Sequence, residues 1–126
     1  GITQTAIGKI EQLQVYGNKF ETRDGSCIRD YIHVCDIAHA HTLALQFLIE
    51  EKNKSNSEIF NLGTGNGVTV LEAIKAFEKI SGVQLNYKIT DPRPGDVVAI
   101  YANKDHAVKT LRCHIKFSLE DMIKTA

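Results

Sequence analysis

The chain has 126 residues, of which 43% are hydrophobic and 24% are charged, the composition of one globular domain. Its 15 basic residues balance 15 acidic ones, which argues against a nucleic-acid-binding surface and against a polybasic membrane anchor. No apolar run approaches the roughly 18 residues that a membrane-spanning helix needs.

The first half of the chain is predicted to contain two helices and a strand. Apolar spacing predicts a helix across residues 2–13, and residues 13–16 form a short apolar piece that ends at a Gly-Asn turn pair. Alternating apolar and polar residues predict a strand at 28–34. Asp36 is predicted to cap a second helix, whose apolar stripe is nearly broad enough for full burial and which ends in the polar stretch 50–57.

The second half begins with a strand predicted at 58–62, which is apolar on both faces and so favours a sheet covered on both sides. Thr69 and Glu72 have the spacing of a capping box, which predicts a helix that ends at Gly82. Strands and helices alternate, so the fold class is α/β or mixed α+β, with mixed strands and helices, and residues 1–126 are treated as a single unit. A third strand, an extended segment and two short helices are predicted at 85–90, 97–101, 104–112 and 118–125.

A glycine-rich turn at 61–67 lies between a strand and a helix, where a dinucleotide-binding fingerprint would lie. The fingerprint G-x-G-x-x-G requires its third glycine at position 68, where this chain has Val68. We therefore interpret the segment as a tight turn that uses glycines for positive φ, and predict no cofactor phosphate there.

Two arginines are candidates for binding a phosphate, because a guanidinium can donate two parallel hydrogen bonds. Arg93 lies in a loop stiffened by two prolines, and Asp96, three residues on, could accept from sugar hydroxyls. Arg29 lies on the polar face of its strand. The residues alone leave open plain surface ion pairs, of Arg93 within its loop and of Arg29 with Asp24 or Asp30.

No pattern predicts a metal site or a catalytic centre. The five histidines lack partners at ligand spacing, and neither a G-x-S-x-G elbow nor a paired-carboxylate pattern is present. The three cysteines, Cys27, Cys35 and Cys113, also follow no ligand spacing, which favours free thiols in a reducing cytoplasm.

Four runs of residues follow one another along the chain: VYGN at 15–18, RDYIHV at 29–34, NLGTGNG at 61–67 and RPGD at 93–96. In order and spacing they resemble the UDP-glucose 4-epimerases of the extended short-chain dehydrogenase/reductase family. Nucleotide-sugar dehydratases and decarboxylases of that family share the arginine-aspartate strand and the final loop. They usually have a shorter connection between positions 17 and 29.

The resemblance implies that residues 1–126 are a C-terminal substrate-binding lobe, and that the NAD-binding Rossmann domain with its Y-x-x-x-K motif is absent from this chain. It implies a cytoplasmic, homodimeric isomerase of galactose metabolism. Such an enzyme interconverts UDP-glucose and UDP-galactose through an NAD-dependent 4-keto intermediate. The segment alone is expected to be inactive, with no catalytic, cofactor-binding or metal-binding residue.

Binding roles for the nucleotide also follow from the resemblance. Tyr16 would stack on the uracil, while the strand backbone at Gln14, Val15 and Tyr16 would bond the edge of the base. Arg29 and Arg93 would hold the pyrophosphate. A diphosphate carries about two negative charges, which two forked guanidinium groups match well.

Roles toward the sugars are implied in the same way. Asp96 would bond the ribose hydroxyls, and Ile100 would line the hexose pocket. The chain departs from the family pattern at Arg112 and Cys113, where Gly-Trp is common, which bears on the packing of the C-terminal helices.

Two alternatives to the epimerase are open. One is a related NAD-dependent nucleotide-sugar dehydratase or decarboxylase, and the other is a non-catalytic UDP-sugar-binding module. A UDP-sugar is the expected partner in each case, with no nucleic acid and no membrane.

Overall fold

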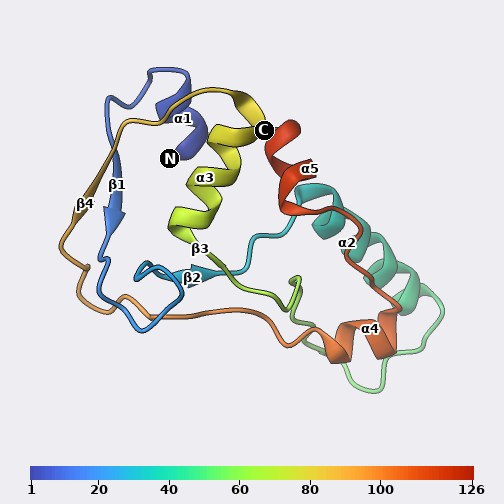
Figure 1. The fold of residues 1–126 in the computed structure, drawn as a ribbon. Coiled ribbons are helices and arrows are strands. Elements are labelled where there is room, and N and C mark those ends of the chain that lie inside the picture. Colours follow the sequence, from blue (N-terminus) through green and yellow to red (C-terminus); the bar gives the residue numbers. More distant parts are fainter.

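A computed structural model describes residues 1–126 (Figure 1). It confirms the mixed helix and strand class, and none of its helices has the length and apolar character needed to cross a bilayer. In chain order the elements are α1 (Ile2–Ala6), β1 (Leu13–Tyr16), β2 (Ile28–Arg29), α2 (Val34–Ile49), β3 (Val68–Thr69), α3 (Val70–Ser81), β4 (Tyr87–Thr90), α4 (Asp105–Leu111) and α5 (Leu119–Lys124).

The strands form two small sheets. β1 pairs in parallel with β4 over its whole length. β2 pairs antiparallel with β3 on one edge, and on its other edge Ile28 forms a parallel bridge with Ala99. The 97–101 segment, predicted to be extended, therefore lies beside β2.

The buried apolar side chains form two clusters. One lies between α3 and the β1–β4 pair and consists of Val15, Ile74, Phe77 and Leu85. The other lies around α2 and α4 and consists of Ala40, Ala107, Leu111 and Cys113. In Figure 1 the β1–β4 pair and the α2–α4 pair lie at opposite ends of the chain's fold.

Polar contacts tie the start of α2 to the C-terminal region. His33, 3% exposed, is the N-cap, and its Nδ1 accepts from the Cys35 amide at 3.0 Å. Because Nδ1 is an acceptor, Nε2 carries the proton and donates to the Thr125 hydroxyl at 2.8 Å. The prediction that Asp36 is the cap is wrong, since its buried carboxylate instead accepts from the backbone amides of 116–117 at 3.0 and 3.1 Å.

Two elements near the N-terminus are shorter than predicted. The helix predicted at 2–13 ends at Ala6, and Gly8 then takes a left-handed φ of 75°, which glycine adopts without a steric penalty. The strand predicted at 28–34 is confined to Ile28–Arg29, since only these two residues pair with β3, and α2 begins already at Val34.

The prediction of a strand at 58–62 is wrong. No backbone hydrogen bond of the chain involves these residues, and the Ile59 side chain is 80% exposed. Phe60 packs edge-on against Phe47 of α2, with ring centroids 6.1 Å apart. Only one of the two apolar faces of this segment is therefore covered.

The apolar stripe of α2 is likewise covered on one side only. Ala40 is buried, whereas Val34, Leu45, Leu48 and Ile49 are exposed. Ile59 is exposed as well, so several large apolar side chains of α2 and the 58–62 segment face solvent.

The capping box predicted for α3 is confirmed. The Thr69 hydroxyl accepts from the Glu72 amide at 3.1 Å, and the Glu72 carboxylate accepts from the Thr69 amide at 2.9 Å. Gly82 ends the helix with a φ of 71°. Arg23 adds two hydrogen bonds to the Glu72 carboxylate, from Nε at 2.8 Å and from Nη2 at 2.7 Å.

We expect this carboxylate to make stability depend on acid pH. The hydrogen bonds from Arg23 and from the Thr69 amide lower the pKa of Glu72 from 4.5 to about 2. A lowered pKa stabilises the folded state above the unfolded value, so this contribution is lost as the pH falls from 4.5 through 2. Thermal unfolding of the protein and of Glu72→Gln across this window checks it.

The wild-type midpoint should fall faster with acid than that of Glu72→Gln. Because the Arg23–Glu72 pair is exposed, added salt should shrink the difference. If the unfolding midpoints of the two proteins fell equally with acid, the stabilising role of the Glu72 carboxylate would be contradicted.

The end of α4 offers a stabilising substitution. Arg112 is the C-cap and takes a left-handed φ of 53°, a conformation that disfavours side chains with a Cβ. We expect Arg112→Gly to raise the free energy of unfolding by about 1 kcal/mol, measured by chemical denaturation. Lys109→Gly, inside the same helix, should lower it by about as much. A loss of stability on Arg112→Gly would contradict the argument.

Candidate functional site

Arg29, Arg93 and Asp96, from the strand and the loop singled out in the sequence, lie together in the structure. The Asp96 carboxylate accepts from Arg93 Nε at 3.1 Å and from Arg93 Nη2 at 2.9 Å. The same carboxylate lies 3.8 Å from Arg29 Nη2 and its side chain is only 11% exposed. The hydrogen bonds from Arg93 lower the pKa of Asp96, so it is charged at neutral pH. Two cations thus share one anion.

Tyr16 belongs to the same cluster. The Arg93 guanidinium lies over the Tyr16 ring, 4.3 Å from its centroid, which is the geometry of a cation–π contact. This contact connects the end of β1 to the proline-bracketed loop that follows β4. We refer to Tyr16, Arg29, Arg93 and Asp96 as the arginine cluster.

Main-chain carbonyls hold Arg29 in place. Its Nη1 donates to the carbonyl of Ile28 at 2.7 Å and to that of Val97 at 2.8 Å. The alternative of an ion pair with Asp24 or Asp30 is not what the structure shows, since the carboxylate nearest Arg29 is that of Asp96. The guanidinium is therefore fixed before any ligand binds, which reduces the entropy that binding costs.

The backbone of β1 has a free edge beside the cluster. The amides of Leu13 and Gly17 donate to carbonyls of the β4 region at 2.9 and 2.8 Å. Since backbone groups alternate along a strand, those of Gln14 and Tyr16 point away from β4. Val15 differs, because its side chain is 1% exposed and its carbonyl accepts from the Thr90 hydroxyl of β4 at 3.4 Å.

Ile100 lies on the segment that leaves the cluster. Its amide donates to the Ile28 carbonyl at 3.1 Å, which fixes its backbone against β2. Its side chain is 53% exposed. Ile100 thus follows the cluster residue Asp96 closely in the chain, and its side chain lies on an open surface.

The glycine-rich turn holds a carboxylate of the protein itself. Asp30 Oδ1 accepts from the Thr64 amide at 3.0 Å and from its hydroxyl at 2.6 Å. Asp30 Oδ2 accepts from the amides of Gly65 at 3.1 Å and Ala102 at 3.0 Å. Burial raises the pKa of Asp30, but these hydrogen bonds lower it by more, so the carboxylate is ionised.

The geometry explains the glycines of this turn. Gly65 has a φ of 75°, as the interpretation of a tight turn requires. A Cβ at Gly63 would lie 2.3 Å from Asp30 Oδ2, so a side chain there would push the carboxylate away. The amides that a cofactor phosphate would need are thus engaged by Asp30, and these residues do not fit a dinucleotide.

The role of Asp30 was missed in the sequence, although a signal was present. In extended chain successive side chains point to opposite faces. Arg29 and Asp30 therefore diverge, and an arginine that faces one site leaves its neighbour for another contact.

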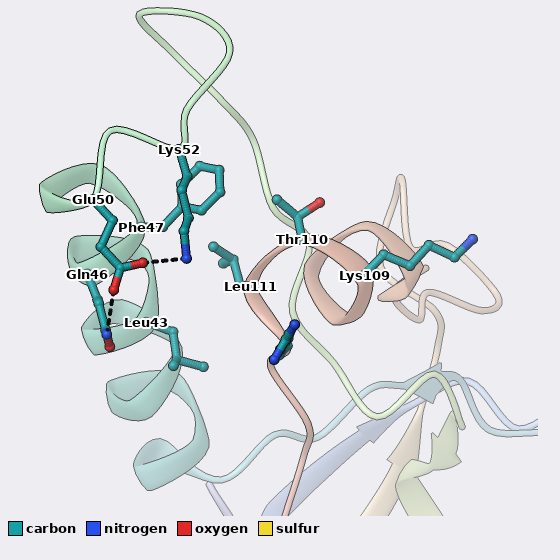
Figure 2. Close-up of a pocket in the computed structure, with 9 residues that line it drawn as sticks. Leu43, Gln46, Phe47, Glu50, Lys52, Lys109, Thr110 and Leu111 are labelled. Atoms are coloured by element: carbon teal, nitrogen blue, oxygen red, sulfur yellow. Dashed lines mark hydrogen bonds and ion pairs between the residues drawn. The ribbon is translucent and has the colours of Figure 1, made fainter.

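A cavity of about 400 Å³ lies between α2 and α4, away from the arginine cluster (Figure 2). Of its charged groups, Glu50 pairs with Lys52 at 2.5 Å and also accepts from Gln46 at 2.9 Å. Figure 2 shows Lys109 extending away from these residues. No group of three or more His, Cys, Asp or Glu side chains could hold a metal ion.

Known proteins resemble this chain over nearly its whole length. It is 45% identical over 121 residues to a UDP-glucose 4-epimerase of Bacillus subtilis, covering 96% of this chain and 35% of that protein. It matches the UDP-glucose-4-epimerase of Stenotrophomonas maltophila, solved with NAD and formylated UDP-arabinopyranose, at a TM-score of 0.91 and 42% identity, covering 98% of this chain and 36% of the other. The Bifidobacterium longum enzyme, solved with NAD+ and UDP, matches at 0.85 and 40%, covering 97% and 35%.

These likenesses define the chain as an α/β protein of the extended short-chain dehydrogenase/reductase type. Residues 1–63, half of the chain, match the NAD dependent epimerase/dehydratase family. The chain belongs to that family. It spans about a third of the length of the curated relatives that it matches.

Proposed function

We propose that this chain is the UDP-sugar-binding part of a UDP-glucose 4-epimerase, which interconverts UDP-glucose and UDP-galactose. The observation that carries the proposal is the meeting of Arg29 and Arg93 on Asp96, beside the ring of Tyr16. The similarity to UDP-glucose 4-epimerases along 96–98% of the chain supports it. It also favours the epimerase over the dehydratase, the decarboxylase and the non-catalytic module.

The cluster suits a nucleoside diphosphate. Its two guanidinium groups face one carboxylate, so they retain an excess positive charge that a pyrophosphate can neutralise with charge-assisted hydrogen bonds. We propose that pyrophosphate draws Arg93 away from the Tyr16 ring and frees that ring for the uracil. The free backbone groups of Gln14 and Tyr16 then lie at the edge of the base, and Asp96 becomes available to the ribose hydroxyls.

The cofactor NAD is proposed to bind outside this chain, in a preceding Rossmann domain that also supplies the catalytic residues. The glycine-rich turn does not serve it, because Asp30 engages the amides of Thr64 and Gly65. A preceding domain would also cover the apolar surface of α2 and Ile59. A homodimer, a cytoplasmic location and a role in galactose metabolism belong to the same proposal.

We expect the complete protein, supplied with NAD, to interconvert UDP-glucose and UDP-galactose, and residues 1–126 alone to show no turnover. A coupled assay of both purified proteins tests this, with NAD omitted as the control. Turnover by residues 1–126 alone would contradict the proposal that the preceding domain supplies the catalytic residues. Formation of a dehydrated or decarboxylated product by the complete protein would replace the epimerase by one of its alternatives.

A further inference from the structure

The carboxylate of Asp30 joins two parts of the chain that are distant in sequence. It accepts from Thr64 and Gly65 on the glycine-rich turn and from Ala102 at the end of the extended segment. Each oxygen accepts two hydrogen bonds, three of the four donors being backbone amides. An ionised carboxylate makes stronger bonds to amides than a neutral group does.

The segment that Asp30 holds is the one that carries Ile100. Three consecutive residues of the β2 region fasten it along its length. Ile28 exchanges hydrogen bonds with Val98 and Ile100 at 2.9 and 3.1 Å. Arg29 donates to the Val97 carbonyl at 2.8 Å, and Asp30 accepts from the Ala102 amide at 3.0 Å.

These anchors differ in what they hold. The anchor at Arg29 lies next to Asp96, at the nucleotide end of the segment. The anchor at Asp30 lies two residues beyond Ile100, at the far end. Loss of the second anchor therefore releases the segment beyond Ile100, which keeps only its own bond to the Ile28 carbonyl, while the arginine cluster retains its contacts.

We infer that Asp30 is a positioning residue for the hexose, which fixes the wall formed by residues 97–102 by tying Ala102 to the glycine-rich turn. The inference rests on the proposed function, because it takes the arginine cluster as the nucleotide site and Ile100 as part of the sugar site. The turn, which resembles a phosphate-binding loop, serves as the fixed support for this tie. Gly63 is required there, since a Cβ would collide with the carboxylate.

Asp24 provides a matched control. Its carboxylate also accepts from one backbone amide, that of Ser26 at 2.9 Å, and from the hydroxyls of Ser26 and Thr69. It supports the start of α3 and makes no hydrogen bond to the 97–102 segment. Asp24→Asn and Asp30→Asn therefore remove the same charge from similar surroundings, but only the second loosens the proposed sugar wall.

The test compares these variants in the complete enzyme. We expect Asp30→Asn to raise KM for UDP-galactose by about tenfold over Asp24→Asn, the loss expected for one hydrogen bond to a charged group. The dissociation constant of UDP, measured by calorimetry, should stay equal in the two variants. Thr64→Val, which removes a single hydroxyl donor, should change KM in the same direction by less and serves if Asp30→Asn does not fold.

Equal KM values for Asp30→Asn and Asp24→Asn would overturn the inference. So would a parallel rise of KM and of the UDP dissociation constant in Asp30→Asn, which indicates general structural damage. If Thr64→Val has to stand in, wild-type KM in that variant overturns the inference as well. Failure of the proposed function shows separately, as undiminished UDP affinity after replacement of Arg29 and Arg93.

Discussion

Replacement of Arg29 or Arg93 by alanine in the complete enzyme is expected to raise the dissociation constant of UDP by about tenfold or more. Each guanidinium would make charge-assisted hydrogen bonds to the pyrophosphate, and loss of one such bond costs about 1.5–3 kcal/mol. Calorimetric titration with UDP measures the change directly.

The two variants should differ in degree. Arg29 is held by the Ile28 and Val97 carbonyls, so it is already oriented, whereas Arg93 is more exposed and has to leave the Tyr16 ring. We therefore expect Arg29→Ala to be the more damaging. Arg23→Ala is the matched control, because Arg23 is an arginine paired with Glu72 outside the cluster. Wild-type affinity in both cluster variants would remove them from the site.

The complete enzyme is expected to act mainly on UDP-glucose and UDP-galactose, with detectable activity on the N-acetylated pair. Ile100→Tyr should abolish the N-acetyl activity and spare the plain hexoses. The resemblance implies that Ile100 lines the hexose pocket, where a tyrosine would crowd the 2-position and a smaller side chain would leave room. A close-packed pocket rejects added volume at a cost of about 1–3 kcal/mol, which makes the branched isoleucine a borderline case. Assays of both sugar pairs with both proteins measure the selectivity.

The structure indicates that this substitution changes the side chain at position 100 without disturbing the backbone. The Ile100 backbone is anchored to the Ile28 carbonyl and its side chain is half exposed, so a larger ring alters the pocket without breaking the anchor. Ile100→Ala should act in the opposite sense and raise the N-acetyl activity. Equal loss on both sugar pairs in Ile100→Tyr would mean that Ile100 is only structural.

The most accurate structural predictions came from local signals. The capping box of Thr69 and Glu72 involves residues three apart, so it depends on nothing outside one helical turn. The strand predicted at 58–62 depends on a partner, and no residue of this chain supplies one. The cap of α2 shows a third case, in which the tertiary contact of Asp36 with residues 116–117 outweighs its preference for a helix start.

The arginine cluster lay beyond what spacing alone could predict. Arg29 and Asp96 meet only because the 97–101 segment lies beside β2, and no local pattern encodes that neighbour. The resemblance to the epimerases supplied the grouping, and pattern alone left both arginines as possible surface ion pairs. Asp30 could have been separated from Arg29 by strand alternation, but its partners in the glycine-rich turn could not.

The parallel pairing of β1 with β4 has a consequence for how the protein folds. Val15 and Thr90, which share a hydrogen bond across the pair, are 75 positions apart in the chain. A contact of such high order requires closure of a long loop, whose entropic cost is met before the strands can stabilise each other. Helix α3, closed by its own capping box, can form earlier from local contacts. Tyr16 and Arg93 therefore come into contact late in folding. During synthesis, more than seventy further residues have to be added after Tyr16 before Arg93 is present.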